Sequence, residues 1–419
     1  MTEKPYNWSD GAELADHSRR KHSIVREYFA DYLRVRCQLP QQSKFRLAVV
    51  DGFAGGGRYK CGAAGSPIIF IEELERAVET LNIARAANGM ATLDVEALLI
   101  FNDLDRGAIE TLKGNVASIE GKIKSTPPRL HLRIEYRNAS FEIAYPAIRA
   151  LLQQGQYPNV LFNLDQCGHT HVAIPTLNDI LQSFRSAEIF YTFVIDSLVA
   201  FLNKSNPAVL TAQLAPLGIK PEQITSLQSA MLSRRDWLGA AERIVFDVFK
   251  SCAPYVSPFS INNPEGWRYW LIHFANSYRA REVYNDVLHD NSSIQAHFGR
   301  SGLDMLAYDP RHDAADLFLF DDNGRKRSKV QLLDDIPRLV SSHGDAITVA
   351  EFYEAVYNVT PARSDDVHAA IIENPDMQVI TPVGGERRKP NTIAVGDTIR
   401  LKRQKSFFPM FVRSKPDDK

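Results

Sequence analysis

The sequence predicts an α/β protein with a Rossmann-like fold, in which helices cover both faces of a doubly wound, mostly parallel sheet. Two observations predict this fold class. Between residues 45 and 196, five short apolar runs alternate with segments in which apolar residues recur at helical spacing. The first run ends in an acid and leads directly into a glycine-rich loop. Strand–helix–strand repeats of this kind join parallel strands through right-handed crossovers.

The five apolar runs predict five strands. They are FRLAVVDGF (45–53), EALLIFND (96–103), LHLRIEYRN (130–138), NVLFNLDQ (159–166) and EIFYTFVID (188–196). Segments 67–88 and 106–123 carry apolar residues at helical spacing and predict crossover helices. An amphipathic helix is expected over 14–38, and the residues on the face that packs on the sheet are Ile24, Tyr28, Tyr32 and Leu33.

The second half of the chain predicts an insertion and a second domain. Residues 206–250 look helical, 268–277 predict a further strand, and a helix follows around 282–289. The charged segment 316–330 interrupts the apolar periodicity, so we place the domains at 1–315 and 316–419. The second domain offers helical patterns at 331–342, 348–358 and 363–373, then strands at 377–382 and 391–402 around a GGERRKP turn. This layout is that of a winged helix-turn-helix.

Composition excludes several classes of protein. The chain has 49 Lys plus Arg and 50 Asp plus Glu, so its overall charge favours neither nucleic acid nor a membrane surface. Its four cysteines have no CxxC spacing, which indicates a reducing compartment and no zinc site. No stretch approaches the roughly 20 apolar residues that a membrane-spanning helix needs. We therefore expect a cytoplasmic protein without a membrane segment.

The strongest functional signal is VVDGFAGGGRYKCGAAGSP (49–67), where a strand ends at Asp51 and a glycine-rich loop follows. Glycines let the backbone approach a ligand closely, as a nucleoside cofactor at the end of a first strand requires. The spacing is not GxGxxG and no GKS or GKT follows, so a phosphate-binding P-loop is disfavoured. A tight turn without a ligand is the alternative.

The next two strand ends offer polar groups to the same crevice. Asp103 and Asp105 follow the second strand, and a carboxylate there can accept hydrogen bonds from a ribose diol. One of the two acids could instead cap the helix that begins near Gly107, and we favour Asp103 for the ribose because it is nearest the end of the strand. Ser140, after the third strand, is a candidate for the adenine edge or for a helix N-cap.

The fourth strand ends in NLDQCGHTH (163–171), which offers Asp165, Gln166 and Cys167 as catalytic candidates. Asp165 is preferred, because an unpaired buried carboxylate is costly and therefore more often serves a site than the core. Cys167 could be a nucleophile or an inert buried thiol. The nearby His169 and His171 with one Asp are incomplete as a zinc site, so we expect no metal there.

Together the glycine loop, FNDLD and NLDQCGH resemble a class I S-adenosylmethionine-dependent methyltransferase. More narrowly, HSRRKHSIVREYF (17–29), DGFAGGGRY followed by GSP, and the expected winged helix resemble the three-Cys-motif partner (TcmP) family. The resemblance implies a methyltransferase that acts with a cysteine-rich partner protein. It places Asp103 at the cofactor's ribose and Asp165 at the transferable methyl group. The residues that it places around the methionine portion are Asp51, Gly52, Phe53, Ala54, Gly55 and Gly57. The sequence lacks the Asn/Asp-Pro-Pro-aromatic turn of amino-methyltransferases that act on nucleic acids.

These observations lead to a methyltransferase hypothesis with S-adenosylmethionine as cofactor and Asp165 orienting or deprotonating the acceptor. DNA or RNA is the first candidate partner, because basic residues cluster in the predicted wing and the strand after it: Arg387, Arg388, Lys389, Lys402 and Arg403. A charged protein-interaction surface is the alternative for that domain. Two other functions stay open: a non-catalytic partner subunit, and a nuclease in which a metal is held by Asp51, Asp103, Asp105 and Asp165.

Overall fold

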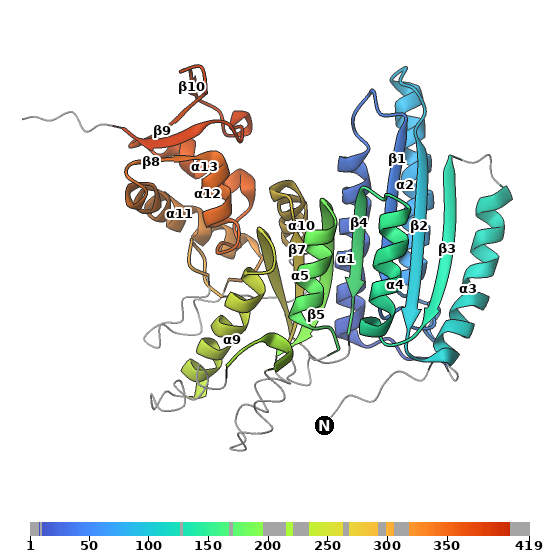
Figure 1. The fold of residues 1–419 in the computed structure, drawn as a ribbon. Coiled ribbons are helices and arrows are strands. Elements are labelled where there is room, and N and C mark those ends of the chain that lie inside the picture. Colours follow the sequence, from blue (N-terminus) through green and yellow to red (C-terminus); the bar gives the residue numbers. More distant parts are fainter. Residues whose placement is uncertain are drawn as a thin grey trace, which may run out of the picture.

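The computed structural model describes Trp8 and residues 11–125, 129–166, 171–195, 215–220, 234–262, 268–291, 299–305 and 318–402. Within these ranges the chain is an α/β protein built on a mostly parallel sheet of seven strands, in the order β3-β2-β1-β4-β5-β7-β6. This arrangement is consistent with the expected Rossmann-like fold (Figure 1). No helix in the described part of the chain has the length and apolarity needed to cross a membrane.

The five predicted strands and the further strand at 268–277 are all confirmed. Their bounds are β1 (Lys44–Asp51), β2 (Asp94–Asp103), β3 (Leu130–Asn138), β4 (Asn159–Leu164), β5 (Ser186–Val194) and β7 (Arg268–Ala275). The first five are parallel, and β7 pairs with β5 in the antiparallel direction. The central strand β1 is buried on both faces, which explains its unbroken apolar run.

In the seven-stranded sheet, the sequence analysis missed one strand, β6 (Tyr255–Asn262). It carries Pro258, and proline argues against a central strand because it cannot donate to the ladder. β6 lies at the edge of the sheet and pairs with β7 alone in the described sheet. An edge strand tolerates a proline whose missing N–H would point away from its neighbour.

The helices occur close to where helical periodicity predicted them. They are α1 (Asp16–Arg36), α2 (Ser66–Ala87), α3 (Arg106–Ser125), α4 (Phe141–Gln154), α5 (Ile174–Ser183), α9 (Arg234–Lys250) and α10 (Tyr278–Asp290). Ile24, Tyr28, Tyr32 and Leu33 of α1 are all at most 4% exposed, so the predicted apolar face is confirmed. Of the helical insertion expected over 206–250, α9 and a short 3-10 turn (Ala215–Leu217) lie within the described residues.

Side chains that alternate along β5 contact helices on both faces of the sheet. The ring of Phe190 lies 4.9 Å from that of Tyr28 in α1 and 5.6 Å from that of Tyr284 in α10. The neighbouring Tyr191 ring instead lies 5.6 Å from that of Phe249 in α9. The sheet is therefore covered on both sides, as a doubly wound fold requires.

The C-terminal part contains the three predicted helices and the two predicted strands. Its elements are α11 (Asp322–Ser342), β8 (Ala346–Thr348), α12 (Val349–Val356), α13 (Ser364–Glu373), β9 (Met377–Ile380), β10 (Glu386–Arg387), a 3-10 turn (Pro390–Thr392) and β11 (Thr398–Leu401). The strands form an antiparallel sheet in the order β10-β9-β11-β8. Capping side chains fix two helix starts: Asp321 accepts from Gly324 N, and Thr348 and Glu351 form a capping box. The proposed boundary at 315/316 lies outside the described residues.

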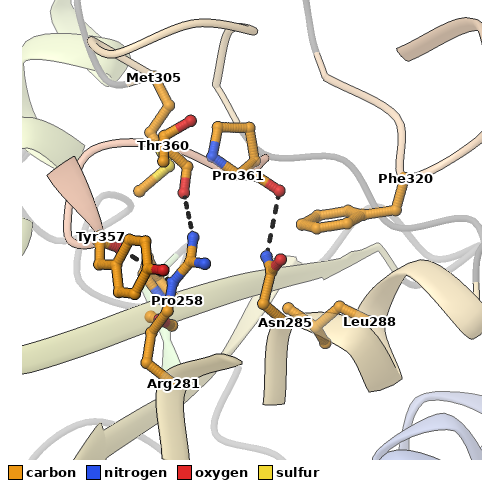
Figure 2. A pocket seen from close by; sticks show the side chains of 10 residues that line it. Pro258, Arg281, Asn285, Leu288, Met305, Phe320, Tyr357, Thr360 and Pro361 are labelled. Atoms are coloured by element: carbon orange, nitrogen blue, oxygen red, sulfur yellow. Dashed lines mark hydrogen bonds between the residues drawn. The ribbon is translucent and has the colours of Figure 1, made fainter. Parts of the chain in front are cut away.

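One helix of the sheet domain, α10, holds the C-terminal helices in place (Figure 1). The guanidinium of Arg281, which is 1% exposed, donates to the carbonyl oxygens of Tyr357 (3.2 Å), Thr360 (2.8 Å) and Ala362 (3.3 Å). Asn285 Nδ2 donates to Pro361 O at 3.1 Å (Figure 2). The turn after α12 is thus fixed to α10 through its backbone, beside a small cavity.

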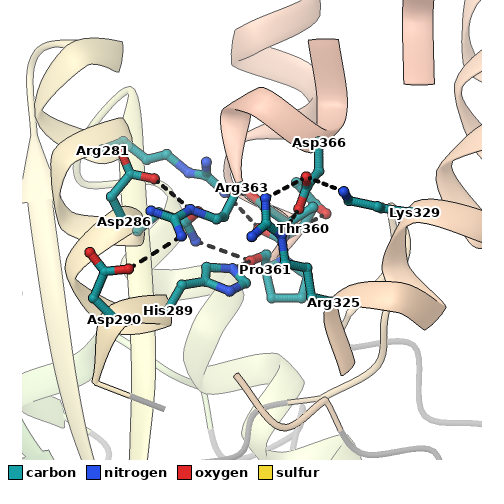
Figure 3. A network of polar contacts seen from close by, with 12 residues as sticks. Arg281, Asp286, His289, Asp290, Arg325, Lys329, Thr360, Pro361, Arg363 and Asp366 are labelled. Carbon is teal, nitrogen blue, oxygen red and sulfur yellow. Dashed lines mark hydrogen bonds and ion pairs between the residues drawn. The ribbon is translucent and has the colours of Figure 1, made fainter. Parts of the chain in front are cut away.

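A surface ion-pair network extends this contact (Figure 3). Arg363 Nε lies 3.0 Å from Asp286 Oδ1, and Arg363 Nη1 lies 3.2 Å from Asp290 Oδ1. On the other side, Asp366 of α13 accepts from Arg325 Nε at 2.6 Å and lies 3.1 Å from Lys329 Nζ. The start of α13 is therefore held between α10 and α11.

Candidate functional site

Three predicted site residues meet at the carboxyl edge of the sheet. β1, β2 and β4 are neighbours in the sheet, and they end at or just before Asp51, Asp103 and Asp165. Doubly wound sheets bind ligands at this edge, outside the carboxyl ends of the strands. The placement expected from the sequence is therefore confirmed for these three carboxylates.

The glycine loop is tied to the end of β2 by Asp103. Gly55 N donates to Asp103 Oδ2 at 2.8 Å, and Asp105 N donates to Asp103 Oδ1 at 2.8 Å. Burial raises the pKa of Asp103, while these backbone N–H groups oppose the rise. Each carboxylate oxygen can accept a further hydrogen bond, so Asp103 can hold the loop and a ligand hydroxyl together.

Two glycines of the loop are required by protein packing. A Cβ added at Gly52 would lie 2.8 Å from side-chain carbons of Leu164 and Phe141. A Cβ at Gly57 would lie 2.5 Å from Leu112 Cδ1, and its φ of +79° favours glycine in any case. Close packing therefore explains part of the glycine pattern that the sequence analysis attributed to a ligand.

Asp51 is completely buried at the end of β1. Its Oδ1 accepts from Asn163 Nδ2 at 3.2 Å and from Phe53 N at 3.4 Å. Burial raises the pKa of Asp51 to about 7, although Ser66 and Asn163 favour its charged form. Asp51 is thus protonated far more readily near neutral pH than an exposed aspartate.

Helix α1 adds a charged partner to Asp165 that the sequence analysis missed. Lys21 Nζ, whose side chain is 7% exposed, donates to Asp165 Oδ1 across 144 positions of the chain. Burial raises the pKa of Asp165, but the Lys21 ammonium, with smaller contributions from Thr192 and His22, holds that pKa below its usual range. Asp165 is therefore a stable carboxylate and a weak base, which favours an orienting role over deprotonation.

Two histidines of α1 lie in the same region. Burial lowers the pKa of His17 and of His22 to about 4, so both rings are neutral at pH 7. The His17 ring stacks on Tyr269 of β7 at 4.3 Å and 6°. The signal that could have revealed the group was the motif HSRRKHSIVREYF, because residues four apart share one face of a helix, as His17 and Lys21 do.

Several buried polar atoms at this edge have no hydrogen-bond partner within the described residues. They are Asp51 Oδ2, Asn102 Oδ1 and His22 Nδ1. Unpaired buried polar atoms cost free energy, and an ordered water or a polar ligand can supply the missing partner. The residues present therefore fit a polar cofactor at the ends of β1 and β2.

The remaining predicted residues of this edge have different roles. Gln166 Oε1 accepts from His171 N (2.9 Å) and Val172 N (3.1 Å), so its carboxamide shapes the turn before α5. Cys167 lies outside the described residues. Ser140 occupies the N-cap position of α4, but its hydroxyl makes no capping hydrogen bond. The adenine contact of Ser140 stays a prediction.

The acids proposed for a nuclease do not assemble into a metal site. Among the described residues, no group of three His, Cys, Asp or Glu side chains is placed to hold a metal ion. Asp105 accepts from Gly107 N at 2.8 Å and so caps α3, which decides which of the two acids takes the capping role.

The basic residues of the C-terminal part are divided between structural contacts and exposed positions. Arg387 donates through Nε and Nη2 to the buried Asp397 at 2.9 and 3.2 Å, and Lys402 Nζ donates to Pro375 O at 2.8 Å. Arg388 and Lys389 are exposed at the end of β10. Arg403 lies outside the described residues.

The first turn of α13 is poorly suited to nucleic acid. In a helix-turn-helix, the N-terminal residues of the second helix enter the major groove. Here that turn carries Asp365 and Asp366, and Arg363 just before it pairs with Asp286 and Asp290 of α10. Any nucleic-acid contact is therefore better assigned to the exposed Arg388 and Lys389 than to α13.

Comparisons with known proteins add no family assignment. No family model matches the chain, and no curated protein matches it. Among solved structures, a putative Zn-dependent alcohol dehydrogenase from Rhodobacter sphaeroides aligns at a TM-score of 0.24 and 11% identity, covering 64% of this chain and all of that one. At this TM-score the alignment does not bear on fold or site. The resemblance to TcmP proteins therefore depends on the sequence motifs.

Proposed function

We propose that the sheet domain binds S-adenosylmethionine and transfers its methyl group. The observation that carries this proposal is the glycine loop after β1, closed onto Asp103 at the end of β2 by a 2.8 Å hydrogen bond. The strand order, with β7 antiparallel between β5 and β6, is consistent with the class I methyltransferase-like fold. The unpaired buried atoms at this edge also support a polar ligand.

Each residue has a part in this proposal. Asp103 accepts hydrogen bonds from the ribose diol while it holds Gly55 in place. When bound, S-adenosylmethionine supplies an electrophilic methyl group. Asp165 faces the acceptor and, as a carboxylate paired with Lys21, orients it by hydrogen bonding. Catalysis then depends on proximity more than on a strong base.

The acceptor and partner follow from weaker observations. We propose DNA or RNA as the acceptor class, contacted by the exposed Arg388 and Lys389. The resemblance to TcmP proteins also supports a cysteine-rich partner protein. Methylation of nucleic acids extracted from the host, with and without co-expressed partners, tests both parts of this proposal.

A second candidate is a non-catalytic subunit that binds the cofactor and works through a partner. The ion pair between Lys21 and Asp165 favours it, because this pair leaves Asp165 a poor proton acceptor. Methyl transfer by the wild-type protein, and its loss in Asp165→Asn, separate the two candidates. For an enzyme, this variant keeps cofactor affinity within roughly fivefold and loses transfer. For a binding subunit, the wild-type protein transfers no methyl group.

Calorimetric titration with S-adenosylmethionine and S-adenosylhomocysteine tests cofactor binding. Asp103→Ala should weaken both affinities by roughly tenfold or more, because it removes two ligand hydrogen bonds and releases Gly55. Asp105→Ala is the matched control, since Asp105 lies two residues away and caps α3. No binding by the wild-type protein, or equal losses in both variants, would contradict the proposal.

A further inference from the structure

Trp8 lies directly against the glycine loop. A Cβ added at Gly55 would lie 2.4 Å from Trp8 Cζ2, and one at Gly56 would lie 2.6 Å from Trp8 Cε3. The Trp8 ring is 5.2 Å from that of Tyr59, which is 5.7 Å from that of His22 in α1. The glycines at 55 and 56 therefore make room for an indole supplied by the chain itself.

The backbone near Trp8 is bound to the far end of the same loop. Gly11 N donates to Trp8 O at 3.3 Å, and Lys60 N donates to Ala12 O at 2.8 Å. Gly11 has a φ of +82°, and a Cβ there would touch Lys60 at 3.4 Å. The first contact links Trp8 to Gly11, and the second links Ala12 to the loop.

The strand order determines which part of a bound cofactor this indole would meet. β1 lies between β2 and β4 in the sheet. A cofactor with its ribose at Asp103 and its reacting group near Asp165 must therefore cross the glycine loop between them. Its sulfonium, next to the reacting methyl group, would pass beside Gly55.

The carboxylates at this edge are already engaged by protein groups, and Asp103 accepts hydrogen bonds from Gly55 N and Asp105 N. Asp165 is neutralised by Lys21, and burial raises the pKa of Asp51 to about 7. His17 and His22 are neutral at pH 7, because burial lowers the pKa of each to about 4. An aromatic face attracts a cation without itself carrying charge, and indole does so best.

We propose that Trp8 forms the wall of the cofactor site beside the sulfonium and holds its positive charge against the indole face. This inference rests on the proposed function, because it requires that S-adenosylmethionine binds at the glycine loop. It predicts that the site prefers S-adenosylmethionine, which carries the sulfonium, over S-adenosylhomocysteine, whose sulfur is neutral. The preference should depend on the aromatic ring at position 8.

The test is calorimetric titration of the full chain with both ligands. Trp8→Leu should lower affinity for S-adenosylmethionine by roughly 3- to 30-fold. The same variant should change affinity for S-adenosylhomocysteine by less than about twofold. Trp8→Phe should retain most of the preference, which separates the ring's role from loss of the fold. Tyr157→Leu is the matched control, because Tyr157 packs under Arg46 near the start of β4, away from the carboxyl edge.

The outcomes separate this inference from the proposed function. If the wild-type protein binds neither ligand, the proposed function fails and this inference fails with it. If the wild-type protein binds both, while Trp8→Leu weakens both equally or neither, the inference about Trp8 alone is overturned. A selective loss of S-adenosylmethionine binding supports it.

Discussion

Replacing Arg281 with methionine should loosen the contact between α10 and the turn after α12. The Arg281 guanidinium donates to three backbone carbonyls of that turn and lies 4.4 Å from the centre of the Tyr357 ring. Methionine fills a similar volume but leaves three buried carbonyl groups without donors. The variant isolates the polar contact, because it removes little packing.

The free energy lost in Arg281→Met is the difference between two opposing contributions. Hydrogen bonds from a charged donor contribute about 1.5–3 kcal/mol each, so three give roughly 5–9 kcal/mol. Keeping the guanidinium out of water costs several kcal/mol, and Arg281 Nη1 faces the small cavity in Figure 2 without a partner in the described part of the chain. The expected net loss is about 3 kcal/mol.

Amide hydrogen exchange is the suitable assay, because a chain with two cores need not unfold in one step. Protection of amides in the segment 357–363 should fall by roughly two orders of magnitude in Arg281→Met, which corresponds to about 3 kcal/mol. Arg34→Ala is the control, since Arg34 forms an exposed pair with Asp31 on α1 and is not bonded to this turn. Equal protection in the two variants would refute this account of the contact.

Three further predictions concern single charges. Asp51→Asn should become more stable relative to the wild-type protein as pH rises from about 4 to 7, because burial raises the Asp51 pKa from 3.8 to about 7 and ionisation in that window destabilises the wild-type folded state. Urea unfolding at pH 4.5 and pH 8 measures the difference in unfolding free energy between the two proteins, and a difference that does not change with pH would contradict this prediction. Arg387→Ala should lower the melting temperature, because the buried Asp397 carboxylate loses its two hydrogen bonds from the guanidinium. An unchanged melting temperature would show that this ion pair does not stabilise the fold. The double variant Arg388→Ala/Lys389→Ala should leave stability unchanged. If these residues contact phosphates, it should reduce by about 2 the steepness with which the logarithm of the binding constant for duplex DNA falls with the logarithm of salt concentration. Identical slopes would favour a protein-docking role.

Much of the sheet domain could be predicted from local patterns. A strand such as Leu47–Val50, buried on both faces, must be apolar throughout, so a short apolar run marks it without knowledge of its neighbours. The same logic predicted Asp51, Asp103 and Asp165 at one edge, because parallel strands end on the same side. β6 escaped this reasoning, since its proline is acceptable only at a sheet edge, which local sequence does not reveal.

The sequence by itself therefore determined the order of β1 to β5 and the three strand-end carboxylates, because these depend on residues close together in the chain. Tertiary structure alone decided which side chains from distant parts of the chain contact one another. Lys21 reaches Asp165 across 144 positions, Trp8 covers Gly55, and Arg281 reaches the turn at 357–362. Such contacts follow no period in the sequence, because they arise only when separate elements pack, and packing determines which charges are paired and which polar atoms remain for a ligand.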